Sequence, residues 1–122
     1  MKKILLIDDS PIVLTSMKKI VGHNGYDIDT SLSGEDAMEK INAGYRPDLI
    51  ITDLNMPGMD GVDVIKEARG VGACRFIPIL ILTTESSAAQ KERARAAGAT
   101  GWLVKPVMPD KLFSVLNQVL PA

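Results

Sequence analysis

The chain has 122 residues, the size of one typical domain, and can bury a core without disulfides or a structural metal. Its 15 acidic and 14 basic residues leave a formal charge of −1, and its two Phe, two Tyr and one Trp are scattered. These figures argue against nucleic acid and against an anionic membrane surface as partners.

The single cysteine and the single histidine belong to no recognisable metal or catalytic cluster. Cys74 cannot form an internal disulfide, so we expect a free thiol in a reduced compartment. His23 cannot by itself build a histidine metal site, and we interpret it as an ordinary polar residue after the first predicted helix.

No segment is suited to cross a membrane. The longest apolar stretch, Phe76–Leu82, is interrupted by Pro78, whereas a spanning helix needs about 20 apolar residues. The apolar start of the chain runs directly into Asp8 and Asp9 and has no signal-peptide cleavage site. We therefore expect a cytoplasmic protein.

The first half of the chain alternates strand and helix patterns. Ile4–Ile7 is an unbroken apolar run, as in a strand buried on both faces, and Asp27–Leu32 alternates, as at a sheet edge. Between these two strands a helix begins, with Ser10 as its N-cap and Pro11 at its first position. Ser33 can cap a second helix after the second strand. Their apolar stripes are Val13, Met17, Ile20 and Val21, then Ala37, Met38 and Ile41.

The second half repeats this alternation. Three apolar runs predict the remaining strands: Leu49–Ile51, Ile79–Leu82 and Leu103–Val104. Helices begin at Gly61, at Ser86 or Ser87 in an alanine-rich segment, and at Pro109. The inward residues of the first and last of these helices are Val62, Ile65 and Ala68, then Leu112, Leu116 and Val119.

Alternating strands and helices of these lengths predict an α/β fold with a parallel sheet covered on both faces. Five strand–helix units favour a flavodoxin-like (βα)5 sandwich, with a five-stranded sheet of order 2-1-3-4-5. No linker, repeat or low-complexity segment divides the chain, so we expect residues 1–122 to form a single domain.

Polar residues end four of the predicted strands, at the edge where ligands bind in such folds. They are Asp8 and Asp9 after the first strand, Asp53 after the third, Thr83 after the fourth and Lys105 after the fifth. Neighbouring strands lie about 4.8 Å apart, so Asp8, Asp9 and Asp53 should share one pocket. Lys105 starts roughly 10 Å away, within reach of its long side chain.

This combination indicates phosphoryl transfer. Carboxylates that lie close together repel, and an open site of oxygen ligands suits Mg²⁺. A lysine and a threonine hydroxyl would hold the oxygens of a phosphoryl group carried by an aspartate nucleophile. A lone Asp at a strand end is usually a turn or cap residue. The specific feature here is the convergence of all four strand ends.

Four segments resemble the receiver domains of two-component response regulators, and most of all the stand-alone chemotaxis branch. They are Ile7–Ser10, Asp53–Gly61, Leu82–Glu85 and Ala97–Pro106. The resemblance covers the whole chain. It implies the same flavodoxin-like fold, with a type II turn at Pro57-Gly58 and a cis peptide bond before Pro106.

The resemblance also implies a role for each site residue. Asp53 is the phosphoacceptor, and Asp8 and Asp9 organise Mg²⁺ together with it. Lys105 pairs with a phosphoryl oxygen, and Thr83 is the hydroxyl that closes on the phosphoryl group.

Three further positions take roles from the resemblance. Asn55 supplies its backbone carbonyl to the metal. Asn55 and Glu85 flank the path of the attacking water and tune the lifetime of the phosphoryl group. Trp102 stands where the family usually has Tyr or Phe, and it turns inward when Thr83 moves.

The function implied is a single-domain response regulator that is phosphorylated by a chemotaxis-type histidine kinase. Without an effector domain, output is by binding a target such as the flagellar motor switch, and a phosphatase is a possible further partner. The protein is not an enzyme, although it catalyses its own phosphorylation and dephosphorylation. The expected output surface is the fourth helix, fifth strand and fifth helix, including Ala88, Ala89, Lys91, Arg93, Arg95, Ala96, Lys111 and Phe113.

Three alternatives remain open. A phosphorelay intermediate would pass its phosphoryl group to another histidine, and the sequence separates it poorly from a chemotaxis regulator. A Mg²⁺-dependent phosphatase with an Asp nucleophile usually has a second acid where Asn55 stands, together with cap insertions. A flavin electron carrier is disfavoured because Asp8 and Asp9 would repel the flavin phosphate.

Overall fold

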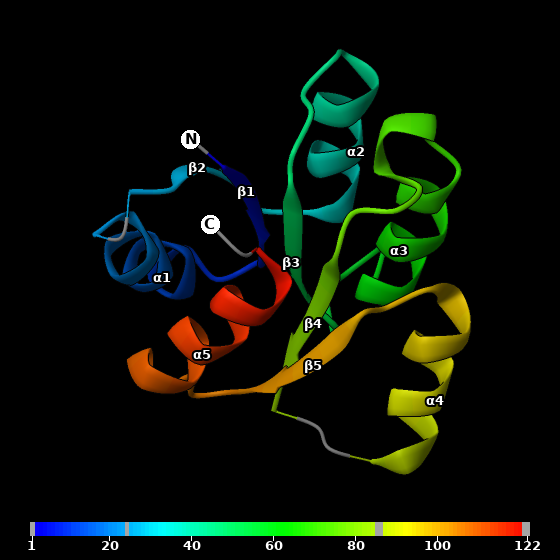
Figure 1. The fold of residues 1–122 in the computed structure, drawn as a ribbon. Helices are drawn as coiled ribbons and strands as arrows, with labels where there is room; N and C mark the ends of the chain where they lie inside the picture. The colour runs from blue at the N-terminus through cyan, green and yellow to red at the C-terminus, as the bar shows by residue number, and fades with distance from the viewer. Residues whose placement is uncertain (1, 24, 85–86, 121–122) are drawn as a thin grey trace.

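The computed structural model describes residues 2–23, 25–84 and 87–120. Strands and helices alternate along these residues, as predicted (Figure 1). The strands are β1 (Lys3–Ile7), β2 (Asp27–Ser31), β3 (Leu49–Asp53), β4 (Ile79–Thr83) and β5 (Gly101–Val104). The helices are α1 (Pro11–Gly22), α2 (Gly34–Asn42), α3 (Gly61–Arg69), α4 (Ala88–Ala97) and α5 (Pro109–Val119), with a short 3-10 helix η1 (Gly72–Cys74) that was not predicted.

The strands form one parallel sheet in the order β2-β1-β3-β4-β5, which confirms the predicted topology. The register brings the carboxyl ends of the central strands level. Asp53 lies beside Leu82, and Thr83 lies beside Val104. The residues that end β1, β3, β4 and β5 therefore meet at one edge of the sheet.

Helices cover both faces of the sheet, and each face has its own apolar core. Residues of α2, α3 and α4 close one core, to which β1 contributes Leu5 and Ile7. Residues of α1 and α5 close the other, to which β1 contributes Ile4 and Leu6. Because side chains of a strand alternate between faces, burial on both faces requires the unbroken apolar runs seen in the sequence.

Side-chain caps fix where the helices begin. The Ser10 and Ser33 hydroxyls accept backbone N–H groups at the starts of α1 and α2, as predicted. At α4 the cap is Ser87; Ser86 lies outside the described residues. Asp60 caps α3 through a reciprocal capping box with Asp63, which was not predicted.

The structure corrects several details of the predicted elements. In α1 the buried residues are Leu14, Met17 and Val21, whereas Val13 and Ile20 are half-buried. β5 begins two residues earlier than predicted, and β2 ends at Ser31. Phe113, predicted at the output surface, is half-buried against the core closed by α1 and α5. It lies one residue after buried Leu112, so the apolar stripe of α5 is wider than predicted.

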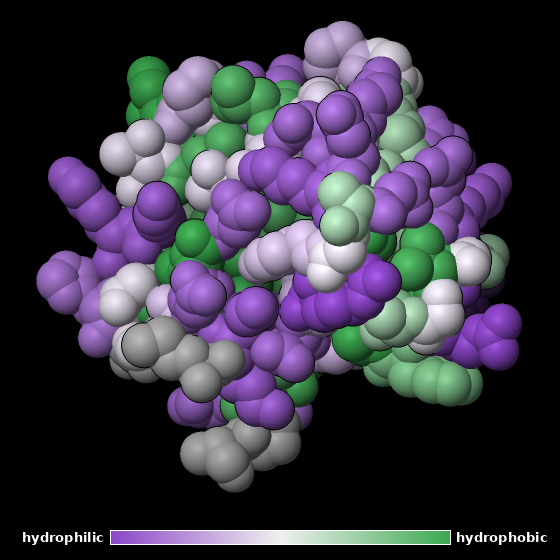
Figure 2. Space-filling view, turned by 90° about the horizontal axis from the view of Figure 1, so that it is seen from above, coloured by the Kyte–Doolittle hydropathy of each residue, from purple (hydrophilic) through white to green (hydrophobic). Residues whose placement is uncertain are grey.

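Viewed from above Figure 1, polar side chains cover most of the surface, and apolar groups occupy small separate areas (Figure 2). Among the described residues, no helix has both the length and the apolar character required to span a membrane.

Candidate functional site

Asp8 follows β1 and is almost completely buried. Its backbone N–H donates to the Ser31 carbonyl, at 3.1 Å, and its Oδ1 accepts the Ser10 N–H, at 2.9 Å. Its Oδ2 lies 2.8 Å from the Nζ of Lys105. The carboxylate is therefore held by the start of α1 on one side and by a cation on the other.

Asp53 ends β3, and its backbone is enclosed by the start of α3. A Cβ atom on Gly61 would lie 2.5 Å from the Asp53 carbonyl oxygen, so only glycine permits this approach. The Gly61 N–H donates to the Leu54 carbonyl at 2.9 Å and closes the loop between β3 and α3. The Asp53 side chain is buried, with Oδ1 3.3 Å from the Nζ of Lys105.

Asp9 completes the acidic cluster from the exposed side. Carboxylate oxygens of Asp8, Asp9 and Asp53 all lie within 4.8 Å of one another. Two of these residues are buried and Asp9 is exposed, so the cluster opens to solvent on one side. Hard oxygen donors with an open side, where water can complete the coordination, fit Mg²⁺.

Lys105 reaches this cluster from the end of β5. Its backbone N–H donates to the Thr83 carbonyl at 2.8 Å, and the Lys105–Pro106 peptide bond is cis, as predicted. Burial lowers the pKa of the Lys105 ammonium, but the hydrogen bond to Asp8 and the charges of Asp53 and Asp8 outweigh burial and raise it above its usual value. The ammonium is therefore firmly charged.

The pKa of Asp53 is raised above that of an ordinary carboxyl group. Burial is the main cause, and the neighbouring charge of Asp8 adds to it. Lys105 lowers the pKa through its charge and its hydrogen bond, and Asp9 raises it again. The ionised Asp53 is thus held at a free-energy cost, because burial and repulsion outweigh the nearby ammonium.

Two further predicted residues lie on β4 and β5, Thr83 at the edge of the sheet and Trp102 two residues before the end of its strand. Thr83 ends β4, directly after the residue paired with Asp53, and is buried. Trp102 lies in β5 and packs, half-buried, against the core on the α4 side. The Lys91 ammonium lies 5.8 Å from the centre of its ring. The indole Nε1 is buried and has no hydrogen-bond acceptor among the described residues.

The loop after Asp53 holds the remaining candidate positions. Asn55 is exposed, and the structure describes no contact that tests its predicted role. Gly58 has φ +72°, the left-handed backbone that a type II turn after Pro57 requires. Glu85 lies outside the described residues, so its predicted role is untested.

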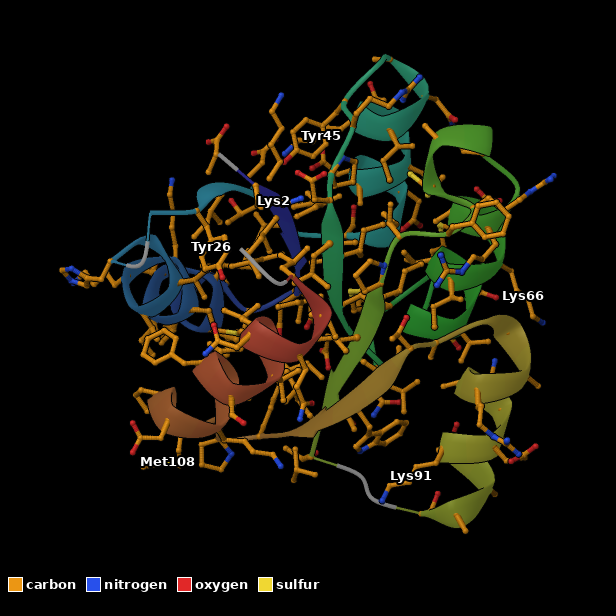
Figure 3. The ribbon with its side chains drawn as sticks, viewed as in Figure 1. Lys2, Tyr26, Tyr45, Lys66, Lys91 and Met108 are labelled. Atoms are coloured by element: carbon orange, nitrogen blue, oxygen red, sulfur yellow. The ribbon has the colours of Figure 1, made fainter. Side chains whose placement is uncertain are left out.

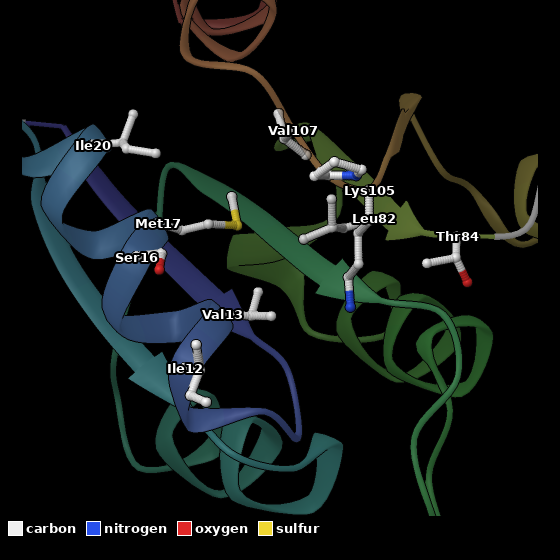
Figure 4. Close-up of a pocket in the computed structure, with 10 residues that line it drawn as sticks. Ile12, Val13, Ser16, Met17, Ile20, Leu82, Thr84, Lys105 and Val107 are labelled. Atoms are coloured by element: carbon white, nitrogen blue, oxygen red, sulfur yellow. The ribbon is translucent and has the colours of Figure 1, made fainter.

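An open apolar pocket, which was not predicted, shares Lys105 with this site (Figure 4). It has a volume of about 430 Å³ and lies between α1 and the segment that follows β5. Ile12 and Met17 line it from α1, and Lys105 and Val107 line it from the opposite side. The sequence offered one signal for this pocket: Ile12 is a large apolar residue outside the predicted apolar stripe of its helix. In the structure its side chain is exposed.

Comparisons with known proteins identify the family to which this chain is similar. Residues 4–117 match the response regulator receiver domain family. Chemotaxis protein CheY1 of Helicobacter pylori is 36% identical over 119 residues, which cover 97% of this chain and 96% of CheY1. Response regulator MprA of Mycobacterium tuberculosis is 33% identical over 118 residues, which cover 97% of this chain but 50% of MprA.

Solved structures of receiver domains also match this chain. Chemotaxis protein CheY4 of Vibrio cholerae matches with a TM-score of 0.94 at 41% identity, covering 98% of this chain and 99% of CheY4. The receiver domain of the sensor histidine kinase PA1611 from Pseudomonas aeruginosa matches with a TM-score of 0.90 at 26% identity. The match covers 99% of this chain and 98% of the PA1611 domain. That structure has a magnesium ion coordinated in its active-site cleft.

The flavodoxin-like fold, the acidic cluster beside a lysine, and matches over nearly the full chain all lead to one family. Its members are signalling proteins of two-component systems, which implies a histidine kinase and a target protein as partners. The chain belongs to the response regulator receiver domains and resembles the CheY chemotaxis regulators among them.

Proposed function

We propose that this protein is a response regulator that accepts a phosphoryl group on Asp53 and signals by phosphorylation-dependent protein binding. The observation that carries the proposal is the Lys105 ammonium, which lies within 3.3 Å of both Asp8 and Asp53 carboxylates. A buried carboxylate at a strand end, faced by a fixed cation, is suited to attack phosphorus and then to retain the phosphoryl oxygens.

Mg²⁺ is the cofactor that fits the acidic cluster. The carboxylates of Asp8, Asp9 and Asp53 would hold it, with the Asn55 backbone carbonyl as a further ligand. When bound, the cation neutralises charge on the phosphoryl oxygens. The open side at Asp9 leaves room for water molecules and the phosphoryl group.

The transfer itself uses groups of this chain. The Asp53 carboxylate forms a bond to phosphorus as the bond from phosphorus to the histidine nitrogen of the kinase breaks, and the leaving imidazole takes a proton. Lys105 is already charged and needs to move little to pair with a phosphoryl oxygen. We expect Asn55 and Glu85 to tune the rate at which water later hydrolyses the aspartyl-phosphate.

The switch runs from the phosphoryl group through Thr83 to Trp102. A phosphoryl group adds negative charge at Asp53. The Thr83 hydroxyl and the Lys105 ammonium then bind the phosphoryl oxygens. The unpartnered Nε1 of Trp102 supports a change of ring position, because a buried donor without an acceptor costs free energy.

The output surface comprises α4, β5 and α5. Its apolar groups include Val104 and Met108, which are both exposed. Lys91 and Arg95 from α4 and Lys111 from α5 add positive charge around them (Lys91 and Met108 are labelled in Figure 3). An apolar centre with basic neighbours fits a target that presents apolar and acidic side chains.

Similarity to CheY1 and CheY4 supports a chemotaxis role in the cytoplasm. We infer a chemotaxis-type histidine kinase as donor, the flagellar motor switch as target and a phosphatase as a possible further partner.

The test is phosphorylation by a small phosphodonor. Incubation with acetyl phosphate and Mg²⁺, followed by intact mass measurement, should show the gain of one phosphoryl group. Asp53→Asn should abolish this gain, whereas Asp63→Asn, at the neighbouring helix start, should retain it. A wild-type protein that gains no mass, or an Asp53→Asn variant modified equally well, would disprove the assignment.

A further inference from the structure

Helix α4 is the least deeply packed of the helices within the described chain. Among the ten residues of Ala88–Ala97, Ala94 alone is buried. Small alanines and charged residues make up most of the helix, so few of its side chains enter the core. The position of α4 therefore depends strongly on the polar contacts that its residues make with neighbouring elements.

One such contact joins α4 to the start of α3. The Nη2 atom of Arg93 donates to Oδ2 of Asp60 at 3.1 Å. The other oxygen of Asp60, Oδ1, accepts the Asp63 N–H at 2.9 Å, and the Asp60 N–H donates to the Asp63 side chain. Asp60 is thus held in a fixed orientation by the capping box, and its free oxygen faces Arg93.

Asp60 directly precedes Gly61, the residue that packs closely against the backbone of Asp53 and Leu54. A Cβ on Gly61 would lie 2.5 Å from the Asp53 carbonyl oxygen. The Gly61 N–H also donates to the Leu54 carbonyl at 2.9 Å. A change in the position of Asp60 can therefore reach the backbone next to Asp53 through the hydrogen bond from Gly61 to Leu54 and through a backbone packing so close that only glycine fits.

We propose that the Arg93–Asp60 ion pair is a latch that couples the position of α4 to the loop after Asp53. The pair is formed in the structure in which Lys105 contacts the unmodified Asp53 carboxylate, so it should favour this state over the phosphorylated one. This inference rests on the proposed phosphorylation of Asp53. It assigns a regulatory role to two residues outside the acidic cluster and the switch.

The magnitude follows from the exposure of the pair. The side chains of Arg93 and Asp60 are 48% and 26% exposed, so solvent weakens their attraction. A pair of this kind should change a binding equilibrium by about two- to fivefold. High salt should reduce the effect, because it screens exposed charges.

The experiment measures the dissociation constant of beryllofluoride, a phosphoryl mimic, by 19F NMR in the presence of Mg²⁺. The variants are Arg93→Ala, Arg93→Lys and Asp60→Asn. Asparagine also caps helices, so Asp60→Asn removes the charge but keeps a capping side chain. The matched control is Arg95→Ala, which removes an equal charge from the same helix, where Arg95 pairs with Glu92.

We expect Arg93→Ala and Asp60→Asn each to bind the mimic about two- to fivefold more tightly than Arg95→Ala. Arg93→Lys should stay near the wild-type value. A double variant that combines Arg93→Ala with Asp60→Asn should bind the mimic no more tightly than either single variant, because each substitution removes the same contact.

Three outcomes would overturn the latch: equal affinity in all variants, weaker binding in Arg93→Ala, or additive effects in the double variant. A wild-type protein that binds no mimic at all would instead disprove the proposed phosphorylation. The two failures are therefore distinct.

Discussion

At the scale of single residues, the site depends on how one cation is shared between two buried acids. Lys105 contacts both Asp8 and Asp53, but Asp8 is the nearer, at 2.8 Å against 3.3 Å. Asp53 is left with a raised pKa and Lys105 with a fixed positive charge. Asp53, the proposed phosphoacceptor, is consequently the more weakly paired of the two acids that contact Lys105, which suits a nucleophile.

Asp53→Asn should stabilise the folded protein at neutral pH. Because folding raises the pKa of Asp53, its ionised form costs stability, and this cost grows as pH rises from the ordinary carboxyl value, about 4, through the raised value. The variant should melt about 3 to 5 °C higher at pH 7 for each kcal/mol relieved. Melting curves should show this gain shrinking toward pH 4. A gain that is constant with pH would contradict the electrostatic cause.

At the scale of elements, the start of α3 holds the end of β3, where Asp53 lies, in place. Asp60 caps the helix, and Gly61 allows its first turn to contact the Asp53 carbonyl. The loop between β3 and α3 is therefore short, and the contacts of Asp60 and Gly61 hold its end against the strand.

Gly61→Ala should be strongly destabilising. The new methyl group would lie 2.5 Å from the Asp53 carbonyl oxygen, so the backbone must shift, at a cost of about 1–3 kcal/mol or more. Denaturant unfolding measures this cost. Gly72→Ala is the control, because no atom lies within 4 Å of a Cβ at that position. Equal stability of the two variants would contradict the close approach.

Trp102 should report occupancy of Asp53 through β5 and α4. Beryllofluoride with Mg²⁺ should change its emission and lower its access to an aqueous quencher, because the ring moves inward. Trp102 is the only tryptophan, so the signal has one source. Thr83→Ala should bind the mimic without this change. Equal quenching in wild type with and without the mimic would show that the ring only packs.

At the scale of the whole molecule, the cluster of like charges couples cation binding to stability. Three carboxylates within 4.8 Å repel in the folded chain and separate when it unfolds. A cation that binds the folded state alone stabilises it by mass action.

Mg²⁺ should therefore raise the melting temperature. At 100 times the dissociation constant the gain is about 2.7 kcal/mol, and Asp9→Ala should remove most of it. Asp9 is exposed, so its loss should leave the fold intact. Thermal melts with and without Mg²⁺ test this, and Asp110→Ala on the surface of α5 is the control. A full Mg²⁺ response in Asp9→Ala would exclude Asp9 as a ligand.

The sequence alone determined the alternation of elements, the sheet order and the strand ends that converge. These follow from local periodicity and from topological rules of parallel sheets, so Asp8, Asp53 and Lys105 could be predicted to meet. The burial of the central strands could also be predicted, because a run that is apolar throughout, such as Ile4–Ile7, is typical of a strand covered on both faces.

Only the tertiary structure decided which long side chains cross between elements. Arg69 donates to the carbonyls of Cys74, Ile77 and Gly98, the last being 29 residues away. The Arg93–Asp60 pair spans 33 residues, and nothing in the local pattern around either residue selects its partner. The reason is physical: periodicity reports which face of an element is buried, whereas a contact between polar side chains depends on the distance and angle at which two packed elements meet.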